Sequence, residues 1–132
     1  MMKVIIAGSR SIVDYGYVEE AIEASGFKVT KVVSGTANGV DRLGEDWAEE
    51  NGVKVKPFPA DWKNLEVKGA VIKENRYGKY NAVAGHQRNE RMAKYAKGLI
   101  AVWDGKSKGT MDMIERMKAK GKKVFVYDIS KV

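Results

Sequence analysis

The 132-residue chain contains no cysteine and a single histidine. Without cysteine it can form no disulfide, no thiol nucleophile and no thiolate metal site, and one histidine cannot build a histidine-rich site. A Ser-His-Asp triad would depend on His86 alone. We therefore expect neither a metal site nor chemistry of that kind, and we interpret His86 as a residue at the start of a helix.

Long apolar runs are also missing. No run approaches the ~20 residues of a membrane-spanning helix, and Gly8 and Arg10 interrupt the N-terminal apolar stretch too early for a secretory signal. We expect a cytoplasmic protein that contacts no membrane. The length fits one domain over residues 1–132. A formal charge of +7 favours anionic partners, but it does not distinguish nucleic acid from a small phosphate compound.

Strand-like and helix-like patterns alternate along the chain. Apolar, mostly β-branched runs predict strands at 3–7, 29–33, 53–58, 99–103 and 124–127. Helical spacing predicts helices over 18–25, 40–51, 87–96 and 110–120. Right-handed crossovers between such strands place the helices against a parallel sheet. We predict an α/β, Rossmann-like, doubly wound fold with a mostly parallel five-stranded sheet and helices on both faces.

Residues 61–84 break this alternation. The segment has mixed charge, two glycines and two tyrosines, and it shows no steady period. We predict a loop with at most a short helix, placed at the edge of the sheet that carries the site. A loop of this length inside a compact domain is typically either functional or disordered.

Three glycine-bearing turns follow predicted strands, at 8–10, 34–41 and 104–110. Any one of them is explained by a tight strand-to-helix turn, but the turns after parallel strands share one edge of a sheet. Glycine lets the backbone approach a ligand, and the amides of a helix N-terminus bind anions. We interpret Thr110 as the cap of the last long helix. The G-x-G-x-x-G and G-x-x-x-x-G-K-[ST] patterns are absent, so we expect neither dehydrogenase-type dinucleotide binding nor a P-loop.

Five fragments occur in an order that resembles the SLOG superfamily, and most of all its small YspA-related branch. They are GSR at 8–10, SGTANGVDRLGEDWA at 34–48, PADW at 59–62, AGHQRNERM at 84–92 and WDGKSKGTMDMI at 103–114. This Rossmann-like group includes the Lonely-guy nucleotide phosphoribohydrolases and the DNA-processing protein DprA. Because its members commonly dimerise through helices, the resemblance implies a homo-oligomer.

Lonely-guy enzymes carry an RKxxM helix and a PGGxGTxxE turn. Arg88 and Met92 match the first motif, with Asn89 in place of its lysine. Glycines 105 and 109 and Thr110 match the second motif, but Met113 replaces its glutamate. A thioether cannot exchange a proton, so this departure argues against phosphoribohydrolase activity.

The resemblance and the turns together suggest individual roles. Arg88 is our first choice for a phosphate contact, because its guanidinium offers a planar fork to two oxygens; the alternative is a surface arginine. Arg10 would close on the same phosphate. Asp41 would accept from a ribose hydroxyl, or cap its helix and pair with Arg42. Asn89 would orient the sugar or phosphate, or simply bond on the helix surface.

Our preferred hypothesis is a module that binds or senses a nucleotide or a nucleotide-derived small molecule, with no cofactor required. The predicted binding residues are Gly8, Ser9, Arg10, Ser34, Gly35, Thr36, Gly39, Asp41, Arg88, Asn89, Gly105, Gly109 and Thr110. The alternative is a nucleoside 5′-monophosphate phosphoribohydrolase, an N-glycosidase whose catalytic acid is Asp41, Asp104 or Asp112.

Aromatic residues of the 61–84 segment leave two further alternatives open. Trp62 stacks on a base or packs beneath the segment. Tyr77, Lys79 and Tyr80, together with the net charge, suggest single-stranded DNA binding. We rank this function last, because no single element carries a visible basic stripe.

Overall fold

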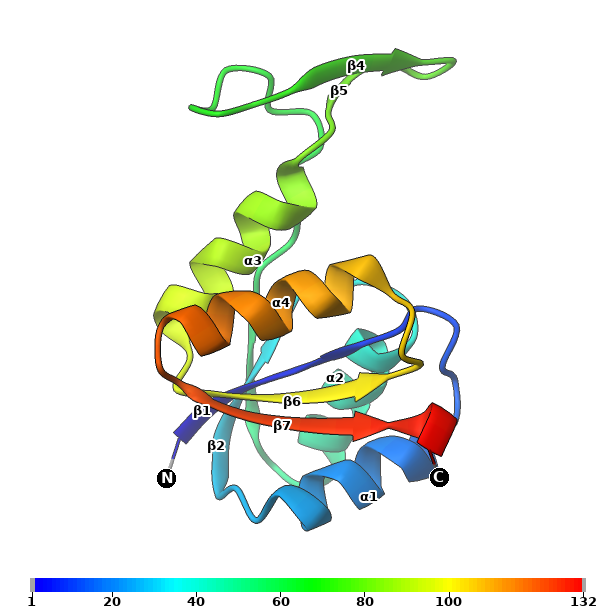
Figure 1. Cartoon of the computed structure of the whole chain (residues 1–132), viewed down its shortest axis with the longest axis vertical. Coiled ribbons are helices and arrows are strands. Elements are labelled where there is room, and N and C mark those ends of the chain that lie inside the picture. The colour runs from blue at the N-terminus through cyan, green and yellow to red at the C-terminus, as the bar shows by residue number, and fades with distance from the viewer. Residues whose placement is uncertain (1, 132) are drawn as a thin grey trace.

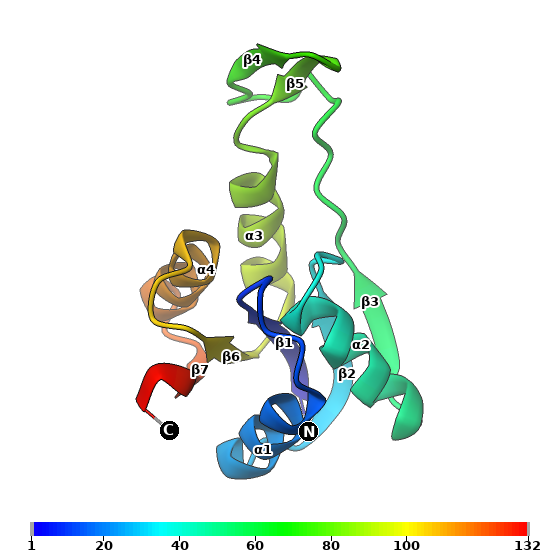
Figure 2. The same ribbon diagram turned by 90° about the vertical axis from the view of Figure 1, so that its right-hand side faces the viewer.

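The computed structural model describes residues 2–131 and contains a five-stranded parallel sheet in the order β3-β2-β1-β6-β7 (Figures 1 and 2). Its strands are β1 (Met2–Gly8), β2 (Val29–Ser34), β3 (Lys54–Pro57), β6 (Gly98–Trp103) and β7 (Lys123–Asp128). The helices are α1 (Tyr15–Ser25), α2 (Val40–Glu50), α3 (Ala84–Tyr95), α4 (Lys108–Ala119) and the short 3-10 helix η1 (Ile129–Lys131). The predicted fold class is confirmed. Within residues 2–131, no helix has the length and apolar character needed to cross a membrane.

The alternating side chains of β1 bury two separate cores. Val4 and Ile6 pack with α1 and α2, whereas Ile5 and Ala7 pack with α3 and α4. A strand covered on both faces is apolar at every position, which is why β1 reads as a continuous apolar run. Figure 2 shows the helices on the two faces of the sheet.

The strand order reverses between β1 and β6. From β1 the chain proceeds outward through β2 to β3, and after α3 it returns to β6 and continues outward to β7 on the other side. At such a switch point the connections leave adjacent strands toward opposite faces, so a crevice opens at the carboxyl ends of β1 and β6. This topology positions the candidate site.

The prediction of an irregular loop over 61–84 is wrong for part of the segment. Strands β4 (Ile72–Asn75) and β5 (Gly78–Asn81) form an antiparallel hairpin, which stands apart from the parallel sheet beyond the N-terminus of α3 (Figure 1). Asn81, which is 1% exposed, lies at the base of the hairpin. Its backbone amide donates to the Trp62 carbonyl at 2.6 Å. Sequence periodicity gave no sign of the hairpin, because every residue of β4 is exposed and no alternation of buried and exposed residues is required.

Gly8 lies at the end of β1, opposite Val102 of β6. A Cβ added there would lie 1.9 Å from the Val102 carbonyl oxygen and 2.8 Å from Val40 Cγ2. We expect Gly8→Ala to lower the free energy of unfolding by about 3 kcal/mol, measured by urea denaturation, because backbone must shift to make room. Gly109→Ala is the matched control, since open space surrounds its position in the first turn of α4. Equal stabilities of the Gly8 variant and the wild type would contradict the close packing.

Candidate functional site

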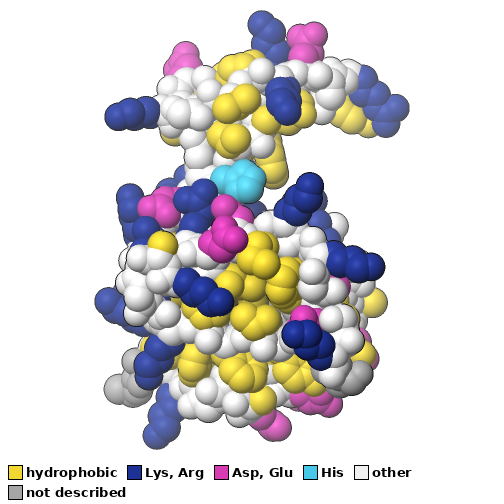
Figure 3. All heavy atoms as spheres, viewed as in Figure 1, with side chains coloured by type: hydrophobic (Ala, Val, Ile, Leu, Met, Phe, Trp, Pro, Cys, Tyr) yellow, Lys and Arg dark blue, Asp and Glu magenta, His cyan; other side chains and the backbone are white. Residues whose placement is uncertain are grey.

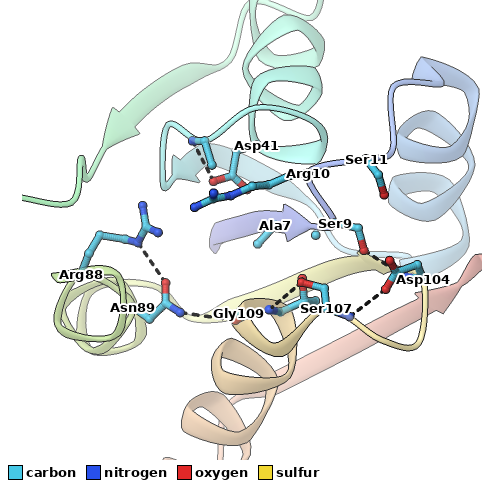
Figure 4. A pocket seen from close by; sticks show the side chains of 13 residues that line it. Ala7, Ser9, Arg10, Ser11, Asp41, Arg88, Asn89, Asp104, Ser107 and Gly109 are labelled. Carbon is cyan, nitrogen blue, oxygen red and sulfur yellow. Dashed lines mark hydrogen bonds between the residues drawn. The ribbon is translucent and has the colours of Figure 1, made fainter. Parts of the chain in front are cut away.

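A cavity of about 370 Å³ lies at the carboxyl ends of β1 and β6 (Figure 4). Nine of the residues singled out from the sequence line it: Gly8, Ser9, Arg10, Asp41, Arg88, Asn89, Asp104, Gly109 and Thr110. Four lining residues were not predicted: Ala7, Ser11, Ala37 and Ser107. Ala37 and Ser107 lie within two of the glycine-bearing turns, and Ala7 and Ser11 flank the third, which was the available signal.

Two smaller hollows adjoin the cavity. One, of about 250 Å³, is lined by Gly35, Thr36 and Trp62, and the other, of about 180 Å³, by Trp62 and His86. Arg10 and Arg88 line all three spaces. The three spaces therefore form a branched cleft around two guanidinium groups.

Arg88 is not a surface arginine, because only 9% of the residue is exposed. Its Nε donates to Asn89 Oδ1 at 3.0 Å, and its Nη1 donates to the carbonyl oxygens of Gly35 and Phe58. Within the described residues its Nη2 makes no hydrogen bond. Burial lowers the pKa of Arg88, while the negative charge of Asp41 raises it. Half of the guanidinium fork is thus fixed by the protein, and Nη2 is left for another acceptor.

Gly35 separates the two buried charged side chains of the site. A Cβ at this position would lie 2.7 Å from Arg88 Nη1 and 2.8 Å from Asp41 Oδ2. Asp41 is 7% exposed and accepts from the Ala37 amide at 3.2 Å, which closes the turn after β2. Within residues 2–131, Asp41 does not form the ion pair with Arg42 that the sequence suggested as an alternative. Burial raises the pKa of the Asp41 carboxyl to about 6.

The turn after β6 is organised by Asp104. One carboxylate oxygen accepts from the amides of Lys106 and Ser107, each at 2.8 Å, and these bonds lower the pKa of Asp104. The Asp104 amide donates to Ser9 Oγ at 3.1 Å and so joins the β1 and β6 turns (Figure 4).

The sequence predicted Thr110 as the cap of α4, but in the structure the cap is Ser107. Ser107 Oγ accepts from the Thr110 amide at 3.4 Å and from the Thr110 hydroxyl at 3.1 Å. Helix α4 therefore begins two residues earlier than expected, at Lys108. Amides in the first turn of a helix lack intrahelical acceptors, and Gly109 and Thr110 bring this turn to the cavity.

Three predicted binding residues shape turns without lining the described cavities. Ser34 Oγ donates to Glu45 Oε2 at 2.5 Å and accepts from the Thr36 amide at 3.1 Å. Gly39 has φ 77° and Gly105 has φ 81°, both in the left-handed region that favours glycine. All three residues therefore shape the turns that carry the lining residues.

Thr36 is the non-glycine residue with positive φ among residues 2–131, at 64°. This conformation is unfavourable for a β-branched side chain, and such residues cluster at ligand sites. The exposed threonine lies in the hollow that continues from the main cavity.

Asp112, a candidate acid, does not line the described cavities. It accepts from Asn89 Nδ2 and from Arg116 Nε, each at 2.9 Å, and pairs with His86 at 3.2 Å. Burial raises the pKa of Asp112, but these hydrogen bonds outweigh it and the net shift is downward. Asp112 holds Asn89 in position. Met113, where Lonely-guy enzymes have glutamate, lies on α4 and is buried in the core.

Trp62 lies at the rim of the cleft, between the base of the hairpin and α3. A Cβ at Gly85 would be 3.4 Å from Trp62 Cη2, so the ring rests on the first turn of α3. It remains 41% exposed, which leaves ring surface open to a ligand.

In residues 2–131, no group of three or more histidine, aspartate or glutamate residues is arranged to hold a metal ion.

Comparison with known proteins finds a similarity to SLOG-type proteins. Residues 2–65 match the model of the YspA, cpYpsA-related SLOG family. The structure of DNA processing protein A (DprA) from Streptococcus pneumoniae is similar, with a TM-score of 0.67 and 23% sequence identity, over 94% of this chain and 49% of that one. The chain thus spans about half of that protein. No curated protein matches it. These findings confirm the resemblance to the SLOG superfamily and the Rossmann-like fold.

The raised pKa of Asp41 predicts a pH-dependent stability. Because its pKa is about 6 when folded and 3.8 in a model compound, the folded protein holds the proton more tightly, and ionisation costs stability as pH rises from about 4 to 6. Asp41→Asn keeps an oxygen for the Ala37 amide but removes the charge. Relative to wild type, we expect the variant to gain up to about 3 kcal/mol between those pH values in urea titrations. Parallel pH profiles for the two proteins would exclude the shift.

Proposed function

We propose that this SLOG-type chain binds a nucleotide or a nucleotide-derived small molecule in the cleft at the carboxyl ends of β1 and β6. One observation carries the proposal. The turns after β1, β2 and β6 meet around one cavity, and two arginines and a helix N-terminus border the same space. Such a crevice at the switch point of a doubly wound sheet is where these folds typically bind ligands.

The phosphate would lie between the first turn of α4 and the two arginines. Gly109 leaves open space over the helix end, and helix N-terminal amides favour an anion. Arg88 Nη2 would donate to one phosphate oxygen, and the exposed Arg10 would close from the other side. The negatively charged phosphate would then contact the two positively charged guanidinium groups within a partly buried space.

The base would extend toward Trp62, which borders the two smaller hollows. A partly exposed indole offers a stacking surface to any base, so this arrangement supports affinity for nucleotides more than selection among them. Asp41 lines the same cavity, and its carboxyl would accept from a ribose hydroxyl between the phosphate and the base.

Arg10 gives a cleaner test of binding than Arg88, because its side chain makes no hydrogen bond with the described residues. We expect Arg10→Ala to weaken the affinity for nucleoside 5′-monophosphates by about tenfold in calorimetry, as one charge-assisted hydrogen bond is lost. Arg42→Ala is the control, since it removes the same charge from an exposed position outside the cavity. Nucleosides without phosphate should bind weakly to wild type. Equal affinities of both variants would contradict the proposal.

A second candidate function, phosphoribohydrolase activity, is favoured by Asp41. It alone of the three candidate acids has a raised pKa, about 6, and it lines the cavity. A protonated carboxyl there would protonate the leaving base while the bond from the anomeric carbon to nitrogen breaks and water adds to that carbon.

Incubation with nucleoside monophosphates tests this activity. If the chain is such an enzyme, chromatography will show free base and ribose 5-phosphate in equal amounts, and Asp41→Asn will reduce the rate by at least about a hundredfold. Absence of free base at high protein concentration would leave binding alone.

A further inference from the structure

Asn89 connects the Arg88 guanidinium on α3 to helix α4. Its Oδ1 accepts from Arg88 Nε at 3.0 Å, and its Nδ2 donates to Asp112 Oδ2 at 2.9 Å and to the Gly109 carbonyl at 3.4 Å. Figure 4 shows the bonds to Arg88 and Gly109. The side chain of Asn89 thus has partners on both of its ends, and the residue is buried.

The partners of Asn89 determine which way round its amide lies. A carboxylate and a backbone carbonyl only accept hydrogen bonds, so both require the NH2 group, whereas Arg88 Nε only donates and requires the oxygen. A reversed amide would place donor against donor at Arg88 and oxygen against oxygen at Asp112. The bond to Asp112 is the shorter of the two that hold the NH2 group. Asp112 therefore sets the direction of the Asn89 oxygen.

The Asn89 oxygen in turn fixes the plane of the Arg88 guanidinium. Nε bonded to Asn89 and Nη1 bonded to the Gly35 carbonyl hold this planar group at two points. The direction of the third nitrogen, Nη2, follows from the other two. A lysine at position 89, as in the Lonely-guy motif, offers only donors and could not accept from Nε. The asparagine at this position therefore permits the arrangement.

Asp112 is itself held in place by neighbours on its other side. Arg116 Nε donates to the same Oδ2 at 2.9 Å, and His86 Nδ1 lies 3.2 Å from Oδ1. Figure 3 shows the histidine at the waist between the hairpin and the body, beside basic and acidic side chains. The carboxylate is thus ordered, and the guanidinium of Arg116 offsets its negative charge.

We propose that Asp112 is a positioning residue of the candidate site, which acts through Asn89 to direct Arg88 Nη2 toward the phosphate of the ligand. The proposal rests on the proposed binding of a phosphate-bearing nucleotide. Asp112 does not line the cavities described above, so it acts without contacting the ligand. A supporting side chain of this kind raises affinity because the binding group is already ordered before the ligand arrives.

Positioning and charge give opposite expectations for Asp112→Ala. Loss of a negative charge near the phosphate would by itself strengthen binding, whereas loss of the acceptor releases Asn89 and Arg88 and weakens it. We expect the affinity for nucleoside 5′-monophosphates to fall about tenfold in calorimetry, because the charge-assisted bond from Arg88 is no longer directed at the phosphate. The affinity for nucleosides without phosphate should change little.

Two further variants separate orientation from charge. Asn89 Nδ2 and Arg116 Nε donate to the same oxygen, and Asp112→Asn keeps one oxygen for them while it removes the charge. This conservative variant should restore the affinity that Asp112→Ala loses. Glu115→Gln is the charge control, because it removes an exposed carboxylate from the same helix and should leave the affinity unchanged. The inference is overturned if Asp112→Ala binds as tightly as wild type, or if Asp112→Asn loses as much affinity as Asp112→Ala.

A measurement without ligand distinguishes this inference from the proposed function. The Nε–H group of Arg88 gives a proton–nitrogen correlation signal in nuclear magnetic resonance spectra, identified by its absence in Arg88→Lys. Its hydrogen should exchange with water at least about tenfold faster in Asp112→Ala than in wild type or Asp112→Asn, with unchanged circular dichroism spectra. Equal exchange in all three proteins would overturn the inference. Absence of nucleotide binding to wild type would instead overturn the proposed function, whereas the exchange rates still decide whether Asp112 orients Arg88.

Discussion

The close approach of β1 to β6 is the constraint on which the rest of the site depends. With no side chain at Gly8, the end of β1 lies directly against the Val102 carbonyl, and the Asp104 amide reaches Ser9 Oγ. The turns that follow these strands then run to opposite faces of the sheet. The crevice between them is a consequence of backbone geometry, and the functional side chains only line it.

Charge is buried in this crevice at a cost to folding. Arg88 and Asp41 both lie largely out of solvent, yet they form no direct ion pair with each other within the described residues; carbonyl oxygens and an amide satisfy them instead. Burial raises the pKa of Asp41 and lowers that of Arg88, so each charged form is destabilised. Thr36 adds a left-handed backbone conformation nearby. Unfavourable features concentrated at one place are typical of a site selected for binding rather than for stability.

The candidate site and the edges of the sheet lie apart in the fold. The cavity lies at the carboxyl edge of the sheet, whereas the edge strand β7 lies at its side. The hairpin of β4 and β5 forms a third feature, anchored through Asn81 and bearing exposed apolar side chains such as Ile72 and Tyr77. Its base carries Trp62 to the cleft, so this extension contributes to the site although most of it stands apart from the body.

The sequence by itself determined the fold class and the convergence of the three glycine-bearing turns. Continuous apolar runs such as β1 specify strands covered on both faces, and parallel strands bring their following turns to one edge. Local patterns also assigned Gly8, Ser9 and Arg10 to that edge, and the resemblance to the SLOG superfamily added Arg88.

Only the tertiary structure decided which structural role each residue at the carboxyl edge of the sheet has. Ser107 rather than Thr110 caps α4, Ser34 and Gly39 shape turns, Asp112 holds Asn89, and Asp41 alone among the candidate acids combines burial with cavity access. The hairpin escaped prediction because its first strand has no buried face to impose a period. Burial, pKa and the direction of a side chain depend on neighbours that are distant in the chain, and local spacing carries no information about them.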